Sequence, residues 1–507
     1  MDDPDLARLE AAVPANVRRV CERLTAAGHQ AVTVGGAVRD ALLDRAPGDW
    51  DVATSAVPEV VLDLFDHTIP TGLQHGTVTV VTGRGAHTHV EVTTFRGEGA
   101  YTDARRPDHV RFGVPLVEDL ARRDLRVNAM AYDPARHELV DPFRGRDDLR
   151  DRVLRAVGPT GDVYADAVAR FSEDGLRVMR AVRFAAQLEF ALDPDTERGI
   201  GPALPSLAKV SRERVSDELR KILGARLPSL ALAIAERTGI IAQVLPSLDA
   251  SFAAWGDART GAIADWCVAV DAAPAAARLA ALVGEPEPGL GAQLASARGD
   301  GFERLARIAL AAGAVRDGAS AREAYDVVVR HRDRVVLIEA KRTAPEDVEQ
   351  GLAARVTRRL DRADARRAEE ALRALKFSNE EIGMAAPLAG TCAATFHAAW
   401  TEADVRRLLA DVTRARAAVA AGLWRAQGAV ALADAADAIL ARGDAIGQGE
   451  LALAGKELMT ELAVPQGPAI GRMLALLLER VLDDPSRNTR DQLIAIARTL
   501  ELETGRG

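Results

Sequence analysis

Two aspartates separated by a single residue are the first group in this sequence that could do chemistry. Asp49 and Asp51 flank Trp50 in a short β-prone stretch. Residues two apart in a strand share one face, so both carboxylates are expected to point the same way. Mg²⁺ prefers oxygen ligands and the phosphates of a substrate. The pair therefore predicts metal-assisted chemistry on a phosphate group.

A glycine pair upstream of these aspartates is a candidate phosphate site. Gly35 and Gly36 follow the apolar run 31–34, where a strand would turn into a helix. Glycine lets the backbone approach a ligand closely, and the first N–H groups of a helix can hold a phosphate. Arg39, one turn into that helix, can add a bidentate contact. Alone, each motif is usually a turn or a solvated loop, but their combination predicts a nucleotide site.

The spacing of these groups resembles the signature of the nucleotidyltransferase superfamily, a glycine pair followed by Asp-x-Asp between apolar residues. The resemblance implies a third carboxylate on a later strand, and Glu91 between Val90 and Val92 supplies it. We therefore expect three carboxylates to meet at one site.

An α/β part over residues 31–150 must position these groups. The expected elements are an amphipathic helix over 5–28, a helix over 55–65, and strands over 78–81 and 89–95. His75 could act as a base, but a turn role is favoured, because metal-assisted transfer needs little help from histidine. Residues 97–110 are rich in glycine and charge, and they are either a mobile loop or an ordinary surface connection.

Helices are expected beyond residue 150. Residues 171–190 predict one helix with an acidic first turn, which suits the helix dipole. Glu173, Arg177 and Arg180 fall at i, i+4 and i+7, so one face is charged. That face is either solvated and salt-bridged, or a surface on which Asp174 and Arg177 read a base edge.

Further helices are expected toward the C-terminus. Residues 209–223 predict a helix with Ser211 at its N-cap, and Arg212 and Arg214 can face phosphates. Residues 226–440 are rich in alanine, the best helix former, and predict further helices.

Composition sets limits on the class of protein. A chain of 507 residues, 48% hydrophobic and 27% charged, predicts three or four globular domains of about 150 residues each. The net charge of −9 means that a nucleic-acid surface must be a local patch. Three well-separated cysteines predict neither a disulfide nor a zinc site, and they favour a reducing cytoplasm. No signal peptide or membrane span is predicted.

Segments along the first half of the chain resemble, in order, the class II tRNA nucleotidyltransferases, the family of CCA-adding enzymes and bacterial poly(A) polymerases. The matching segments are GGAVRD with DWD, EVTTFR, YTDARRPDHVRF, DLARRDLRVNAMA, residues 145–149, EDGLRVMRAVRF and SRERVSDEL. They run over residues 30–223. Residues 449–493 are a weaker match to the C-terminal domain of shorter CCA-adding enzymes.

The resemblance implies an α+β fold with four parts. A small polymerase-β-like catalytic head at 1–150 is followed by all-helical parts, a base-selecting neck at 151–225, a body at 226–440 and a tRNA-binding tail at 441–507.

The resemblance also implies the roles of single residues. Asp49 and Asp51 would bind two Mg²⁺ ions, with Glu91 as the third catalytic carboxylate. Gly35, Gly36 and Arg39 would hold the triphosphate. Further nucleotide contacts would come from Arg123, Asp124, Asn128, Glu173, Asp174, Arg177, Arg180 and Arg183. Among these, Glu173, Asp174 and Arg177 would select CTP and then ATP. Arg212 and Arg214 would contact tRNA.

The implied activity is template-independent addition of CCA to tRNA 3′ ends from CTP and ATP, with no membrane and no obligatory protein partner. Alternatives are a poly(A) polymerase, an enzyme that adds only CC or only A, transfer of a nucleotide to a protein, and a non-catalytic RNA-binding protein. Two departures leave the nucleotide preference open. Leu125, Arg126 and Val127 stand where the family usually has Phe-Thr-Ile, and Gly175 stands where proline is common.

Overall fold

The structure is a computed structural model that describes residues 3–84, 88–98, 110–253, 259–284, 327–331, 334–338, 362–392, 400–462 and 467–504. It comprises two compact units, Met1–Pro246 and Ser247–Gly507. The predicted boundaries at 150, 225 and 440 stay predictions.

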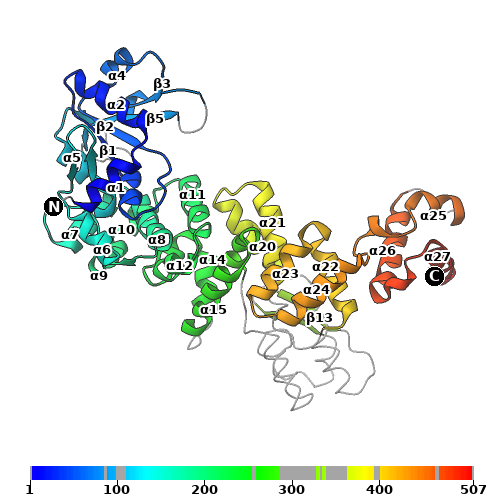
Figure 1. Ribbon diagram of the computed structural model, residues 1–507. Coiled ribbons are helices and arrows are strands. Elements are labelled where there is room, and N and C mark those ends of the chain that lie inside the picture. The colour runs from blue at the N-terminus through cyan, green and yellow to red at the C-terminus, as the bar shows by residue number, and fades with distance from the viewer. Residues whose placement is uncertain are drawn as a thin grey trace. The chain divides into compact units, whose positions relative to one another are not determined.

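A seven-stranded sheet forms the centre of the first unit, with the strand order β3-β4-β5-β2-β1-β8-β9 (Figure 1). Its strands are β1 (Ala31–Val34), β2 (Asp51–Thr54), β3 (Thr68–Gly72), β4 (Thr77–Val81), β5 (His89–Thr94), β8 (Ala131–Asp133) and β9 (Glu138–Val140). β2 and β5 are parallel, and the other neighbours are antiparallel. The predicted strands at 31–34, 78–81 and 89–95 are confirmed to within one residue.

Helices pack on both faces of this sheet where its strands carry apolar side chains. On one face, Val32, Val34 and Ala53 pack against Leu116 and Leu120 of α5 (Leu116–Ala121). The remaining helices of this part are α1 (Pro4–Ala12), α2 (Ala15–Ala26), α3 (Gly36–Leu42) and α4 (Pro58–Leu64). α2 contacts β1 and α4 contacts β4.

The predicted single helix over 5–28 is wrong. α1 ends at Ala12 and α2 begins at Ala15. Val13 and Pro14 between them are extended, because a proline pushes the preceding residue out of the helical region.

Helices follow the sheet up to the end of the first unit. They are α6 (Gly145–Asp151), α7 (Val163–Glu173), α8 (Leu176–Leu188), α9 (Pro194–Arg198), α10 (Ile200–Leu207), α11 (Arg212–Leu223), α12 (Pro228–Arg237) and α13 (Ile240–Val244). β10 (Val153–Leu154) and β11 (Ala191–Leu192) add a short parallel pair. α11 begins one residue after Ser211, as predicted for an N-cap, although no hydrogen bond from the Ser211 side chain caps it.

The predicted single helix over 171–190 is also wrong. α7 ends at Glu173, and Asp174 is extended with φ −132° and ψ 105°. A Cβ on Gly175 would lie 2.2 Å from the backbone nitrogen of Leu207, so only glycine allows α10 to approach this closely. The acidic residues therefore lie at a break between two helices and not in the first turn of one.

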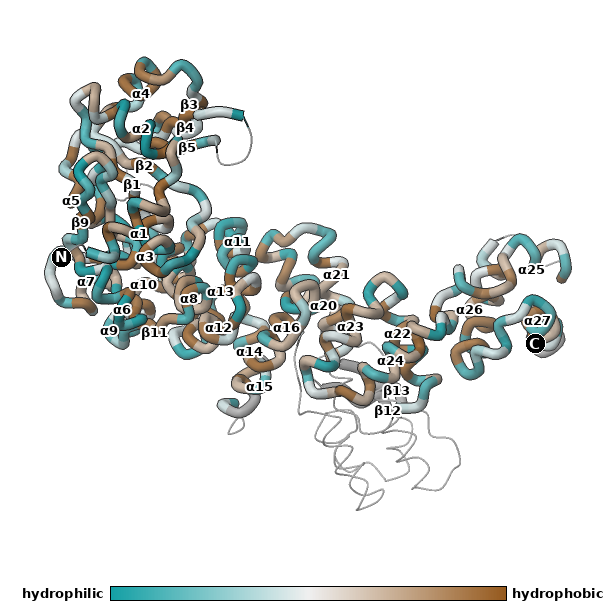
Figure 2. Tube along the Cα trace, in the orientation of Figure 1, coloured by the Kyte–Doolittle hydropathy of each residue, from teal (hydrophilic) through white to brown (hydrophobic). Residues whose placement is uncertain are grey.

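The second unit is mostly helical. Its helices are α14 (Pro246–Ala253), which begins at the boundary, α15 (Arg259–Ala272), α16 (Arg278–Val283), α20 (Arg362–Ala374), α21 (Asn379–Ala389), α22 (Glu402–Val412), α23 (Arg414–Ala426), α24 (Val430–Arg442), α25 (Gly455–Leu462), α26 (Pro468–Asp483) and α27 (Arg490–Thr504). Figure 2 shows hydrophobic and hydrophilic stretches alternating along these helices. Leu458, Leu477 and Leu493 belong to a hydrophobic core formed by residues 445–500.

A β-hairpin corrects the prediction that residues 226–440 are entirely helical. β12 (Val327–His331) pairs with β13 (Arg334–Ile338) in antiparallel fashion. Both strands are rich in valine, whose branched side chain favours a pleated strand over a helix. The α+β fold class, a sheet-containing head followed by mainly helical parts, is confirmed.

Candidate active site

Asp51 and Glu91 lie beside one another on the parallel strands β2 and β5. Val52 lies opposite Val92, so the residues that precede them are neighbours on the other face, and adjacent strands are about 4.8 Å apart. Asp49 precedes β2. It is exposed like Asp51, whereas Trp50 between them is buried. The two aspartates therefore emerge on the same side, and the parallel pairing adds Glu91 to them.

The electrostatics of this site favour a cation. Desolvation and the charge of Glu91, with a smaller contribution from Asp49, raise the pKa of Asp51 to about 6, while the charge of Arg123 opposes the shift. Among the described residues, no three His, Cys, Asp or Glu side chains are assembled as a metal cage. Mg²⁺ usually takes one or two carboxylates together with substrate phosphates. Exposed, mutually repelling carboxylates fit an ion that arrives with a nucleotide.

The glycine pair lies against two guanidinium groups. Gly35 has φ +76°, and a Cβ there would lie 2.9 Å from Nη1 of Arg123. A Cβ on Gly36 would lie 3.5 Å from Nη2 of Arg39. A side chain at Gly35 would therefore crowd Arg123, whereas a Cβ on Gly36 would make only an ordinary contact with Arg39. The glycine pair lies beside two guanidinium groups, and such groups can hold a triphosphate.

A buried hydrogen-bond chain connects the glycine loop to α8. Arg39 Nη1 donates to Asn128 Oδ1 at 2.6 Å, and Asn128 Nδ2 donates to Asp124 Oδ1 at 3.0 Å. Arg180 Nε of α8 donates to Asp124 Oδ2 at 2.7 Å. Burial by itself would raise the pKa of Asp124, but the charge of Arg180 and hydrogen bonds from Asn128, Arg180 and the Leu125 N–H hold it well below its usual range.

This chain changes how two predicted nucleotide contacts are interpreted. Asp124 and Asn128 are each only 5% exposed, and their polar atoms bond to protein groups. They lie behind Arg39 and Arg180 and orient those side chains. Direct contact of Asp124 or Asn128 with a nucleotide stays a prediction.

Three arginines surround the ring of Phe184. The guanidinium carbons of Arg39, Arg180 and Arg183 lie 5.1, 5.5 and 4.2 Å from the ring centroid. Each is within range of a cation–π interaction. Arg183 Nε also lies 2.8 Å from Oε2 of Glu218 on α11, and burial lowers the pKa of Arg183. The cluster therefore brings together residues of α3 and α8 that were predicted to bind the nucleotide.

Glu173 orients Arg177 across the break between α7 and α8. Oε2 of Glu173 accepts hydrogen bonds from Arg170 Nη1 and Arg177 Nη1, each at 2.7 Å. Arg177 Nη2 donates to the carbonyl of Arg122 at 2.9 Å. Arg177 is thus held in one orientation by both helices and by the segment that follows α5.

Asp174 is hydrogen-bonded to Arg214, a residue that was predicted to contact tRNA. Arg214 Nη2 of α11 donates to Asp174 Oδ2 at 3.1 Å. Arg214 therefore lies at the predicted base-selecting position, although the sequence suggested a phosphate contact for it. Arg212 lies at the first position of α11 and is half-buried. The tRNA contacts of both arginines stay predictions.

Sequence reasoning missed two buried acids. Asp119 is 1% exposed, accepts from Arg122 Nε at 2.9 Å and lies 3.5 Å from Arg123 Nη2. Its signal was the i, i+3, i+4 spacing of one acid and two arginines. Glu218 is 3% exposed on α11. Its signal was a charge among the apolar positions of an amphipathic helix.

His75 lies in the turn η1 (Leu73–His75), as predicted. Its carbonyl accepts a hydrogen bond from Arg96 Nη1 at 2.6 Å. The predicted loop 97–110 lies outside the described residues except at its ends, which belong to β6 (Arg96–Glu98) and β7 (Val110–Phe112).

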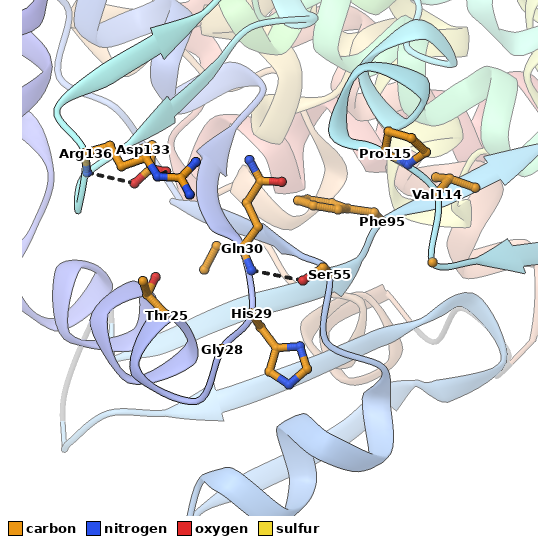
Figure 3. A pocket seen from close by; sticks show the side chains of 12 residues that line it. Thr25, Gly28, His29, Gln30, Ser55, Phe95, Val114, Pro115, Asp133 and Arg136 are labelled. Carbon is orange, nitrogen blue, oxygen red and sulfur yellow. Dashed lines mark hydrogen bonds and ion pairs between the residues drawn. The ribbon is translucent and has the colours of Figure 1, made fainter.

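A cavity of about 580 Å³ lies at the opposite end of β1 from the glycine pair. Figure 3 shows His29, Gln30 and Ser55 on one side of it and Phe95 and Pro115 on the other. Gln30 donates its backbone N–H to Ser55 Oγ at 2.9 Å. Because the carboxylates lie at the other end of the strands, this cavity is not the candidate active site.

Three family models match successive parts of the chain. Residues 31–155 match the poly A polymerase head domain, and residues 189–252 match a model described as "Probable RNA and SrmB- binding site of polymerase A". Residues 353–497 match domain 2 of tRNA nucleotidyltransferase.

Curated relatives resemble the first half of the chain. A CCA-adding enzyme of Geobacillus stearothermophilus is 47% identical over 229 residues, 45% of this chain and 54% of that protein. One of Leuconostoc mesenteroides is 46% identical over 224 residues, 44% of this chain and 53% of that protein. The chain thus spans about half the length of the curated relatives it matches.

A solved structure extends the similarity to the whole fold. The crystal structure of the Bacillus stearothermophilus CCA-adding enzyme in complex with CTP has a TM-score of 0.61 and 28% identity. The alignment covers 97% of this chain and 100% of that one.

The carboxylates on the sheet and the arginine-lined glycine loop define a nucleotidyltransferase head. The chain belongs to the class II tRNA nucleotidyltransferase family. Nucleotidyltransferases of this kind are normally metal-dependent. None of the described helices combines the length and the apolar character that crossing a membrane requires.

Proposed function

We propose that this protein adds CCA to the 3′ ends of tRNA, using CTP and ATP and no nucleic-acid template. The observation that carries the proposal is the placement of Asp51 and Glu91 beside one another, next to a glycine pair lined by Arg39 and Arg123. The names of the relatives, CCA-adding enzymes, and the CTP bound in the similar structure support these substrates.

We further propose that the metal is Mg²⁺, held by Asp49 and Asp51 with Glu91 beside them. When bound, Mg²⁺ supplies a Lewis acid that lowers the energy of charge developing on phosphate oxygens. The remaining contributions come from protein groups. The guanidinium groups of Arg39 and Arg123 bind the triphosphate and stabilise the charge of the departing pyrophosphate. No covalent enzyme intermediate is needed.

Base selection falls to Asp174 and Arg177 in this proposal. A carboxylate accepts hydrogen bonds and a guanidinium donates them, so the two together match the mixed edge of a nucleobase. Glu173 holds Arg177 in place, and Arg214 holds Asp174. This arrangement supports a rigid protein template in place of a complementary strand.

The assay that tests this function uses tRNA lacking its 3′ CCA, CTP, ATP and Mg²⁺. We expect extension by three nucleotides in the order C, C, A, resolved by stepwise incorporation of each labelled nucleotide. Long A tails would indicate a poly(A) polymerase, the alternative that agrees with the match of residues 31–155 to the poly A polymerase head domain. Extension stopping at CC, or A addition only to tRNA ending in CC, would indicate a partial enzyme. Absence of extension together with Mg²⁺-independent RNA binding would favour a non-catalytic role.

Nucleotide binding should weaken in mildly acidic solution. A proton on Asp51 competes with Mg²⁺, and the pKa of Asp51 in the metal-free protein is raised to about 6. We expect the apparent Mg²⁺ affinity in the presence of CTP to be constant above pH 7. It should fall by about tenfold for each pH unit below pH 6. Calorimetric titration between pH 5 and 8 measures it, and Asp51→Asn, which cannot hold the cation, should show a much lower Mg²⁺ affinity at every pH. A flat profile in the wild-type protein would contradict the assignment of Asp51.

The cytoplasmic location predicted from the cysteine distribution stays a prediction, as does the tRNA-binding role of residues 441–507.

A further inference from the structure

We propose that the 3′-terminal nucleotides of the acceptor RNA lie over β5, β4 and β3, on the side of Asp51 that is away from the glycine pair. The proposal rests on the function proposed above and assigns a surface and positioning residues to the second substrate.

The register of the sheet places the relevant residues in one lateral row. Val34, which precedes the glycine pair, lies opposite Asp51. Glu91 lies beside Asp51 and opposite Thr79, and Thr79 lies opposite Ile69 of the edge strand β3. Cross-strand partners share a face. The row therefore runs from the triphosphate side, through the carboxylates, to the sheet edge.

The geometry of the reaction assigns opposite ends of this row to the two substrates. In nucleotidyl transfer the attacking and the leaving oxygen lie on opposite sides of the phosphorus. Arg39 and Arg123 lie at the glycine pair, so the leaving pyrophosphate lies on the β1 side of Asp51. The attacking 3′-hydroxyl must then approach from the Glu91 side, over β5 and the strands beyond it.

The surface on that side suits an unpaired RNA end. The hydroxyl oxygens of Thr77 and Thr93 are 3.1 Å apart, and those of Thr71 and Thr79 are 2.9 Å apart. Each pair uses one of its two protons, so the other is available to a ligand. Threonine hydroxyls are common contacts of phosphate and sugar groups. Thr77 and Thr93 are half-buried and Thr71 is exposed, so a backbone can reach them.

Apolar side chains complete this surface at the edge strand. Ile69 is 44% exposed in the same row, and Leu73 in the following turn is 43% exposed. β3 lies three strand spacings from β2, which is roughly 14 Å. An extended end with its hydroxyl at Asp51 can therefore place its last bases over Ile69 and Leu73. Unstacked bases are recognised by such apolar contacts together with hydrogen bonds.

A photo-crosslinking experiment locates the RNA end directly. The probe is an acceptor-stem minihelix that ends in CC and carries 4-thiouridine at the unpaired position just before these two nucleotides, irradiated with the full-length protein and mapped by mass spectrometry. We expect adducts within residues 68–77. Adducts confined to α3 or α5 would overturn the proposal.

Steady-state kinetics with an unmodified minihelix that lacks CCA test the positioning residues. Thr93→Val removes one hydroxyl, and we expect the KM for RNA to rise about three- to tenfold, with the KM for CTP unchanged. Thr93→Ser should restore the wild-type value. Thr68→Val, on the same edge strand but on the other face, is the matched control and should change neither constant. A rise in the KM for CTP alone would overturn the proposal.

The two proposals fail in different ways. Adducts at residues 68–77 in a protein that never extends RNA would refute the CCA-adding function and keep the RNA surface. Extension by CCA with adducts elsewhere would refute the surface and keep the function.

Discussion

Asp51→Asn lowers kcat/KM for CTP incorporation by about 10³-fold or more, the effect expected when a preorganised charge is removed from a catalytic site. The amide has the shape of the carboxylate but none of its charge, so it cannot hold a cation against the nucleotide phosphates. Single-turnover incorporation on tRNA lacking CCA measures the loss. The same loss is expected for Asp49→Ala, the other predicted metal ligand.

The stability of Asp51→Asn should change in the opposite direction from its activity. Desolvation and the charges of Glu91 and Asp49 raise the pKa of Asp51, so the charged carboxylate is disfavoured in the folded protein. Replacing it by a neutral group removes that repulsion, and the Tm should be unchanged or higher. A group whose removal abolishes activity without loss of stability serves function and not folding.

A matched control separates the site from a general effect of lost charge. Asp63→Asn changes an exposed aspartate on α4, and we expect it to leave both kcat/KM and Tm unchanged. Substantial activity in Asp51→Asn would refute the catalytic role proposed for the Asp51 carboxylate.

Asp124→Asn should destabilise the first unit by about 2–4 kcal/mol. Removing one partner of a buried ion pair leaves the other charge uncompensated, and each hydrogen bond to a charged group contributes about 1.5–3 kcal/mol. The side chain of Asp124 is 5% exposed, whereas that of Arg180 is 36% exposed, which keeps the loss below that of a fully buried pair. The midpoint of denaturant unfolding measures it.

The pH dependence of this loss has a definite sign. The pKa of folded Asp124 is depressed, so its stabilising contribution is fully present above the ordinary aspartate pKa of about 4 and is lost as the pH falls further. The difference between wild type and Asp124→Asn should therefore be constant at neutral pH and shrink in acid. A difference that grows as the pH falls would contradict the ion-pair account.

The activity of Asp124→Asn reports its positioning role. Because Asn128 connects Asp124 to Arg39, we expect the KM for CTP to rise by about 10- to 100-fold, as is common for residues behind a ligand-binding group. A double-mutant cycle with Arg180→Gln should show strong coupling. Asp147→Asn, which loses only surface ion pairs with Arg144 and Arg150, is the control and should leave the Tm unchanged.

Much of the candidate site follows from local rules that act over a few residues. Gly35 with φ +76° and the shared orientation of Asp49 and Asp51 were predictable, because turn preference and strand alternation depend only on near neighbours. The α+β class was predicted from the family resemblance. The motifs retain their order along the chain, so the family resemblance could add Glu91 and the predicted base-selecting segment without any knowledge of contacts.

Tertiary structure decided how these parts meet. The parallel pairing of β2 and β5 brings Glu91 beside Asp51, and α10 packing on Gly175 splits the predicted helix over 171–190. Arg214 reaches Asp174 across forty residues of sequence, and no local pattern encodes such a distance. Asp124 and Asn128 are oriented by partners on other elements. Local sequence thus determined which groups are present and in what conformation, whereas packing determined which of them touch, because contacts between distant segments depend on the whole chain.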